Sequence, residues 1–262
     1  MIALRVNAER LALLGWSRAI LLQMAHPLIA AGVAEHSSFR ATPLAAVSRL
    51  RETVRAMLAL TFGDPIAHGH AIARIRAIHT RVHGELRESV GAYPAGARYS
   101  AEDPALLLWV HATLLESVVL VYEQLVGPLS AAERDQYLVE AADVAIALGA
   151  IDADLPRTWT ALEAYLAQEY GSGRICVGAD ARMVVDVVLF PPLSAISGPF
   201  AWVNRVVTLG LLPPFVRDQY HYAWTAGRES QFKRVTGAIR GLRRVTPNAL
   251  ALWPEARANK LS

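Results

Sequence analysis

The apolar residues of this chain recur at helical spacing almost throughout, and glycine or proline divides them into segments of helix length. In the first segment, residues 4–24, Leu4, Leu11, Leu14 and Leu21 lie three or seven positions apart. No stretch alternates apolar and polar residues between hairpin turns. The pattern therefore predicts an all-α protein.

Capping signals place the ends of the predicted helices. Asp103-Pro104 is a cap followed by proline in the first turn, and Ser130 with Glu133 forms a capping box. A further helix is expected to start at Pro27, and residues 85–103 are expected to form a loop. We expect a single domain over residues 1–262 with about nine or ten helices. The other predicted ranges are 4–24, 43–61, 66–83, 104–126, 131–148, 157–170, 179–189, 214–226 and 228–244, with an apolar stretch broken by Pro and Gly after residue 186.

Composition excludes several classes of protein. Hydrophobic residues make up 53% of the chain and charged residues 19%, so the chain has enough apolar surface to fold. With 17 Gly, 14 Pro and one Cys, it is neither collagen-like nor a disulfide scaffold. The apolar excess predicts a bound apolar cofactor or ligand, a membrane surface or a subunit interface.

The charge balance gives little support to nucleic-acid binding. Lys and Arg number 26 against 23 acidic residues, and the one dense basic patch comprises Arg234, Arg240, Arg243 and Arg244. Nucleic-acid binders carry a stronger bias, with stacking aromatics or a known motif. A solvated helix face or a contact with anionic lipid is the preferred interpretation.

Cysteine content and hydropathy predict a cytoplasmic protein without a membrane span. The single Cys176 has no partner for an intrachain disulfide. The uncharged runs Ala19–Ala34 and Val187–Asn204 are interrupted by polar residues, proline or glycine. Peripheral membrane contact through residues 187–216 stays open as an alternative.

Seven of the eight histidines precede residue 112, and His26, His79 and His111 lie in apolar helical contexts. The zinc-protease motif, Glu-x-x-His pairs and cysteine clusters are all absent. His79 and His83 are spaced to share a helix face. One axial histidine in an apolar pocket is the arrangement that haem requires. A non-haem iron site of His26, His79, His111 and a carboxylate is the alternative.

The predicted helix 43–61 carries Arg49, Glu52 and Thr53 at helix-neighbour spacing. One interpretation is a surface ion pair on an amphipathic helix. The other is a distal haem side, where Arg49 and Thr53 donate hydrogen bonds to bound oxygen.

Three segments resemble the signatures of the DUF2236 family, which includes the rubber oxygenases (latex clearing proteins) and the fungal oxygenase of mycophenolic acid biosynthesis. The first is Leu22-Gln23-Met24-Ala25-His26-Pro27-Leu28, followed by Gly32-Val33-Ala34-Glu35-His36-Ser37. The second is residues 78–84, IHTRVHG, and the third is residues 103–113, DPALLLWVHAT. The resemblance covers roughly residues 10–240.

The resemblance implies a helical fold that holds haem b and an oxygenase that uses O₂. It implies His79 as the axial iron ligand, with His83 as the alternative, and Arg49 and Thr53 as distal residues. Glu52 stands where rubber oxygenases have a lysine, and Glu35 is a candidate acid or base.

In this interpretation His26 and His111 line the pocket, and the substrate is an apolar small molecule of isoprenoid or lipid type. The rival hypothesis is a non-catalytic protein that binds an apolar ligand or a membrane surface.

Overall fold

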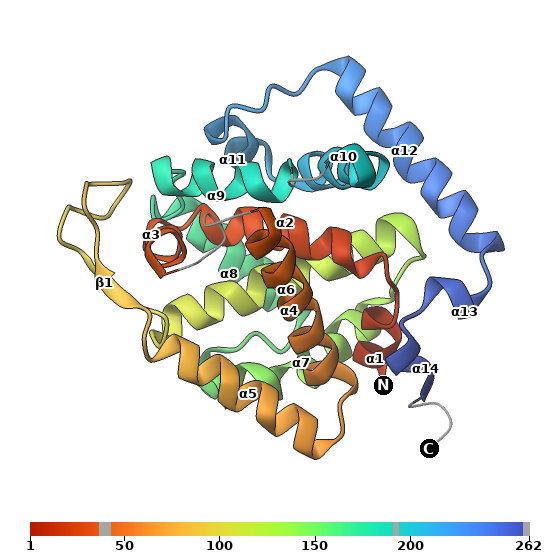
Figure 1. Ribbon diagram of the computed structural model, residues 1–262, viewed down its shortest axis with the longest axis horizontal. Coiled ribbons are helices and arrows are strands. Elements are labelled where there is room, and N and C mark those ends of the chain that lie inside the picture. The colour runs from red at the N-terminus through yellow and green to blue at the C-terminus, as the bar shows by residue number, and fades with distance from the viewer. Residues whose placement is uncertain (37–42, 191–193, 259–262) are drawn as a thin grey trace.

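The computed structural model describes residues 1–36, 43–190 and 194–258, and there it contains fourteen α-helices and one two-stranded sheet (Figure 1). The all-α prediction is confirmed, although the helices of the described part outnumber the nine or ten expected. The elements are α1 (Ile2–Asn7), α2 (Ala12–Met24), α3 (Pro27–His36), α4 (Pro43–Phe62), α5 (Pro65–His79), β1 (His83–Glu85), β2 (Arg98–Ser100), α6 (Pro104–Leu125), α7 (Ala131–Leu148), α8 (Trp159–Gly171), α9 (Ala179–Leu189), α10 (Ser194–Leu211), α11 (Pro214–Gln219), α12 (Ala226–Val245), α13 (Asn248–Ala251) and α14 (Pro254–Ala258).

The centre of the molecule is the contact between α2 and α6 (Figure 1). Gly15 lets the two backbones approach closely, because a Cβ atom at this position would lie 2.9 Å from the carbonyl oxygen of Ser117. The predicted cap of α6 is present, with Asp103 accepting a hydrogen bond from the backbone N–H of Ala105 at 2.8 Å. The predicted capping box of Ser130 and Glu133 opens α7.

Helix α6 also has the length and hydropathy of a membrane-spanning helix, although the sequence predicted no membrane span. In its most apolar window, 56% is buried inside the protein. That burial is typical of the core helix of a globular domain.

The expected helix 4–24 is divided into α1 and α2, which corrects the prediction. Glu9 lies in the break, is buried, and accepts two hydrogen bonds from Arg243 at 2.6 and 2.8 Å. The backbone N–H of Trp253 bonds the carbonyl oxygen of Ala8 at 2.9 Å. Contacts with the distant C-terminal segment thus interrupt a helix that local periodicity would continue.

The expected helix 66–83 ends four residues early. Helix α5 stops at His79, and β1 pairs antiparallel with β2, with His83 opposite Ser100. The backbone N–H of Ala101 bonds the carbonyl oxygen of Val82 at 2.9 Å. The pairing of β1 with β2 thus ends α5 before residue 83. His79 and His83 therefore do not share a helix face.

The C-terminal part also differs from the prediction. The stretch after residue 186 contains the 18-residue helix α10, which continues through Pro199, since a proline removes one backbone donor without ending every helix. The predicted helices 214–226 and 228–244 become the short α11 and the long α12. Between them Tyr220 is buried and donates to the carbonyl oxygen of Leu21 at 2.8 Å. Helix α12 runs along the outer edge of the molecule (Figure 1).

Candidate oxygenase site

Helices α4 and α5 form an antiparallel hairpin whose alignment is marked by one ion pair. The guanidinium of Arg74 lies 3.3 Å from the carboxylate of Glu52 across the two helices. In an antiparallel hairpin, residue numbers rise along one helix as they fall along the other. Two residues therefore lie at the same height when their numbers add up to the same total as 52 and 74. The end of α5 at His79 therefore lies level with the first half of α4, which carries Arg49.

His79 is half-buried at the last turn of α5. Its Nδ1 is buried and has no hydrogen-bond partner, although buried polar groups nearly always have one. Burial lowers the pKa of His79, and the nearby Glu102 opposes that effect. The imidazole thus presents one buried nitrogen that no protein group satisfies.

The inner face of α5 is incompletely covered. Ile72, Ile75 and His79 follow helical spacing and are half-buried, and none of the fifteen residues of α5 is fully buried. Ordinary amphipathic helices bury their apolar stripe against the core. Ile72 and Ile75 are therefore only partly covered by the described side chains.

The alternative ligand His83 and the predicted distal residues of α4 lie in different surroundings from His79. His83 is exposed in β1, and its carbonyl oxygen lies 3.2 Å from Nε2 of His36. Thr53 is exposed on α4, and the Glu52 carboxylate of the Arg74 pair is also exposed. The backbone of Arg49 belongs to α4, but its side chain lies outside the described residues.

Glu35 stands at the centre of a polar cluster at the end of α3. The hydroxyl of Tyr99 donates to its carboxylate at 2.6 Å, and the guanidinium of Arg87 lies 3.8 Å away. Nε2 of His36 lies 3.4 Å from the same tyrosine oxygen. The Tyr99 hydrogen bond, with smaller effects of Arg87 and His36, lowers the pKa of Glu35.

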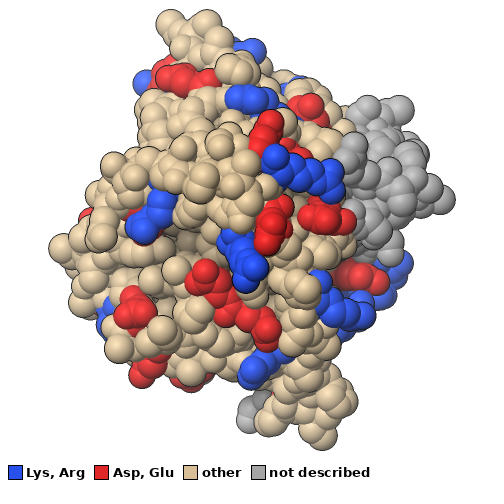
Figure 2. Space-filling model, turned by 90° about the vertical axis from the view of Figure 1, so that its left-hand side faces the viewer, with Lys and Arg blue, Asp and Glu red and all other residues tan. Residues whose placement is uncertain are grey.

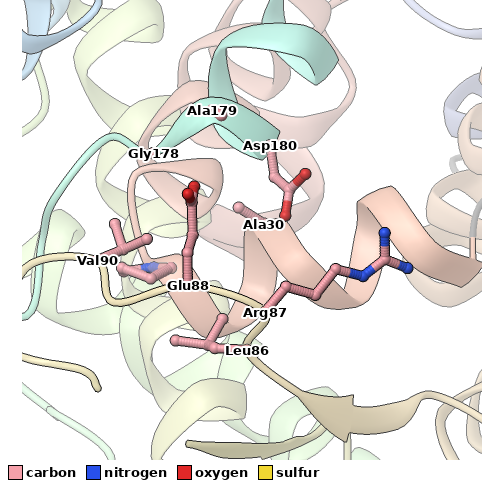
Figure 3. Close-up of a pocket in the computed structure, with 9 residues that line it drawn as sticks. Ala30, Leu86, Arg87, Glu88, Val90, Gly178, Ala179 and Asp180 are labelled. Carbon is pink, nitrogen blue, oxygen red and sulfur yellow. The ribbon is translucent and has the colours of Figure 1, made fainter. Parts of the chain in front are cut away.

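Two pockets open on this side of the described protein, one of them beside Glu35. The larger, about 280 Å³, lies between α3, the segment 86–90 and the start of α9 (Figure 3). In Figure 3 the Glu88 side chain points toward Gly178 and Ala179, whereas Arg87 extends away from them. The smaller, about 60 Å³, is lined by Glu35, Glu85, Arg87 and Asp180 among others.

The face that carries these pockets mixes acidic and basic side chains across its middle (Figure 2). Of the predicted site residues, only Glu35 lines either pocket. Sequence reasoning missed Tyr99, Arg87 and Asp180, because they come from a strand, a loop and a helix start that no local pattern joins.

His26 is buried between α2 and α3, away from solvent. Its Nε2 lies 3.0 Å from the hydroxyl of Tyr93, whereas its Nδ1 is buried without a partner. Burial lowers the pKa of His26 to about 4, and Arg174 adds to the effect. The ring is therefore neutral at pH 7.

His111 is half-buried on α6. Burial lowers its pKa to about 4, with a smaller contribution from Arg157. Within the described residues, no three His, Cys, Asp or Glu side chains gather closely enough to hold a metal ion. His26, His79 and His111 therefore do not form one ligand set, and the non-haem iron alternative finds no support in the described part.

Comparison with known proteins finds one family model and two curated relatives. The model of the family described as "ER-bound oxygenase mpaB/B'/Rubber oxygenase, catalytic domain" matches residues 4–241. The uncharacterized proteins Rv2237 of Mycobacterium tuberculosis and Mb2261 of Mycobacterium bovis are each 30% identical over 179 residues, which cover 67% of this chain and 68% of theirs. No solved structure matches significantly.

An all-α chain with an unsatisfied histidine at a helix end is thus matched over most of its length by a family of oxygenases. The chain belongs to the mpaB/rubber oxygenase catalytic-domain family. Membership supports an enzyme of the oxygenase kind, which acts on a small molecule with O₂.

Proposed function

We propose that this chain is a haem b-dependent oxygenase, folded as a single helical domain, with His79 as the axial ligand. The buried, unpartnered Nδ1 of His79, in a chain of this oxygenase family, is the observation that carries the proposal. A histidine that binds iron through one ring nitrogen needs a hydrogen-bond partner or a neighbour for the other. His79 has no protein partner at Nδ1, so Nδ1 is the ring nitrogen left for a bound group, and Nε2 would then need the second partner.

The incompletely covered face of α5 supports the same assignment. Ile72 and Ile75 lie on the same side of α5 as His79 and remain half-buried. A porphyrin needs apolar walls of this kind beside its axial histidine. His83 lacks these features, because it is exposed in β1. The surroundings of His79 therefore fit haem, and those of His83 fit it less well.

Haem, when bound, supplies the activation of O₂, and the protein supplies the surroundings. We assign Arg49 and Thr53 on α4 as donors that orient oxygen, since α4 forms the hairpin with the helix that carries His79. Glu35 is the better placed proton carrier, because it lines a pocket and Tyr99 holds its carboxylate. Glu52 is the second candidate for that role. Its carboxylate pairs with Arg74 at the surface, and this ion pair must break before Glu52 can carry a proton.

His26 and His111 are assigned to the protein side of the cofactor pocket. Both have pKa values lowered to about 4 by burial, so both present neutral rings at pH 7. In the proposed pocket, these neutral imidazoles and the apolar residues of α5 would give a lining with little charge. Such a lining favours an apolar substrate, of isoprenoid or lipid type, over a charged one.

An absorbance spectrum of the full chain after haem reconstitution tests the proposal. We expect a Soret band and about one haem per chain by the pyridine haemochrome method, in line with a single axial histidine. His79→Ala should lose or shift the Soret band. His83→Ala is the matched control, four residues away and exposed, and should retain the wild-type spectrum.

Three outcomes would overturn the proposal: no Soret band after reconstitution, an unchanged spectrum in His79→Ala, or loss of the band in His83→Ala alone. Iron without a Soret band would indicate the non-haem alternative. For the substrate class, O₂ uptake should rise with squalene or oleic acid as probes and not with a sugar. Haem-free protein that co-purifies with lipid would instead favour a non-catalytic lipid binder.

A further inference from the structure

Helix α12 concentrates positive charge on one edge of the molecule. It carries six of the 26 Lys and Arg residues but only one of the 23 acidic residues, so the helix has a net charge of +5 and the rest of the chain −2. A molecule with this asymmetry turns its α12 edge toward a negatively charged surface.

The structure separates the basic patch seen in the sequence into inward and outward parts. Arg243 points inward and is held by Glu9. Lys233, Arg234 and Arg244 are exposed. Lys233 pairs with Glu229 of the same helix at 3.1 Å, and its side chain is still 71% exposed. The outward cations are therefore available to a partner.

The inner side of α12 is already occupied by the protein. Val235 and Ile239 pack against a buried cluster that includes Val207 of α10. Thr236 is buried and accepts a hydrogen bond from Gln124 of α6 at 3.2 Å. The helix is therefore anchored on one side, and its opposite side faces outward along the edge (Figure 1).

Exposed aliphatic side chains follow the cations at the end of this helix. Leu242 is 66% exposed, Val245 is 77% exposed, and Leu250 of the next helix, α13, is 67% exposed. Between them and the cations, a Cβ atom at Gly237 or Gly241 would meet nothing within 4 Å. Gly237 and Gly241 thus add no side chain to the outward face between Arg234 and Leu242.

We propose that the outward face of α12, together with Leu250, docks this protein on an anionic phospholipid bilayer. Basic residues beside exposed aliphatic ones are the features by which amphipathic helices lie at a lipid interface. The cations contact lipid phosphates while Leu242 and Val245 enter the interfacial region. A second copy of the chain fits this face less well, because Lys233, Arg234 and Arg244 would meet like charges.

Co-sedimentation of the full chain with vesicles tests the docking surface. One set of vesicles is pure phosphatidylcholine, and the other contains about 30% phosphatidylglycerol, an anionic lipid content that attracts basic segments. We expect binding to the anionic vesicles at low salt, little binding to the neutral ones, and release at high salt.

Two double variants examine the two components of the face. Lys233→Ala/Arg234→Ala should bind anionic vesicles about thirtyfold more weakly, from a contribution of about 1 kcal/mol by each cation near a membrane surface. Leu242→Ser/Val245→Ser should also bind more weakly, and its remaining binding should be more sensitive to salt. Both pairs are exposed, so folding is expected to stay intact.

Matched controls change the same residue types elsewhere. Arg76→Ala/Arg98→Ala removes two exposed cations, and Ile66→Ser/Ile151→Ser removes two exposed aliphatic side chains. Both should bind like the wild type. The proposal is overturned if the wild type does not sediment with anionic vesicles, or if α12 and control variants weaken binding equally. It is also overturned if Leu242→Ser/Val245→Ser abolishes a dimer seen by sedimentation while vesicle binding is unchanged.

Discussion

Glu52 and Arg74 lie 3.3 Å apart across the α4–α5 hairpin, and their contact shows how the two helices are aligned. Both side chains are more than half exposed, so the pair itself contributes little to stability. Its importance is geometric, because the same alignment puts His79 level with residue 47, two residues before Arg49, and Thr53 level with residue 73. The residues proposed to face the cofactor from two sides thus belong to two consecutive helices.

Gly15 is expected to be intolerant of even one additional methyl group. A Cβ atom there would lie 2.9 Å from the backbone oxygen of Ser117 and 3.0 Å from Cα of Val118, and backbone atoms in a helix cannot move aside independently. Gly15→Ala should therefore lower the free energy of unfolding by about 1–3 kcal/mol in chemical denaturation, the usual cost of overpacking.

Gly69→Ala is the control, because a Cβ atom at that position of α5 would meet nothing within 4 Å. It should stabilise the protein by about 0.5–1 kcal/mol through helix propensity alone. Equal effects of the two substitutions would show that the contact between α2 and α6 is not as close as described.

The buried pair of Glu9 and Arg243 should be costly to break. Arg243→Gln leaves a carboxylate that is 7% exposed without its guanidinium partner. Removal of one partner of a buried pair typically costs about 3 kcal/mol, so the urea midpoint should fall clearly. Lys233→Gln removes a cation from an exposed pair with Glu229 and should cost less than about 0.5 kcal/mol. A comparable loss in both variants would contradict this prediction.

Much of the fold could be predicted from the sequence, because caps and periodicity act locally. The starts of α6 and α7 follow from Asp103-Pro104 and from Ser130 with Glu133, and both are present. The errors occur where distant segments intervene. Glu9 is tied to Arg243, and the residues after His79 pair with β2, so local helical periodicity does not decide either segment.

In the candidate site too, local sequence signals could be predicted and contacts between distant segments could not. The family signatures indicated His79 and Glu35, but no pattern placed Tyr99 or Arg87 next to Glu35. His79 and His83 look equivalent at a spacing of four residues. Only the end of α5 between them shows that one is half-buried and the other exposed.

His26 is expected to make stability depend on pH in the acidic range. Its pKa is about 4 in the folded protein and about 6.5 when unfolded, so the unfolded chain binds more protons between these values. The contribution is fully present above about pH 6.5 and is lost as the pH falls toward 4. From pH 7 to pH 5 the free energy of unfolding should drop by roughly 2 kcal/mol on this account.

Urea denaturation at several pH values, with His26→Gln beside the wild type, measures this effect. The variant should show a smaller decrease in the acidic range, whatever its stability at pH 7. An equally steep decrease in both proteins would assign the pH dependence to other groups, such as His111, whose pKa is also lowered to about 4.

The Tyr99 hydroxyl is expected to set the acidity of Glu35. Its 2.6 Å hydrogen bond is the largest cause of the lowered pKa of that carboxyl group, ahead of Arg87 and His36. Tyr99→Phe should therefore raise the Glu35 pKa toward its ordinary value, as measured by carbon NMR titration of the labelled side chain. Arg87→Ala is the control and should raise it less, since that guanidinium is 3.8 Å away and largely exposed. If Glu35 carries the proton in the proposed oxygenation, the acidic limb of the rate profile should move to higher pH in Tyr99→Phe. A changed carboxyl pKa with an unmoved acidic limb would assign the proton transfer to another group, such as Glu52.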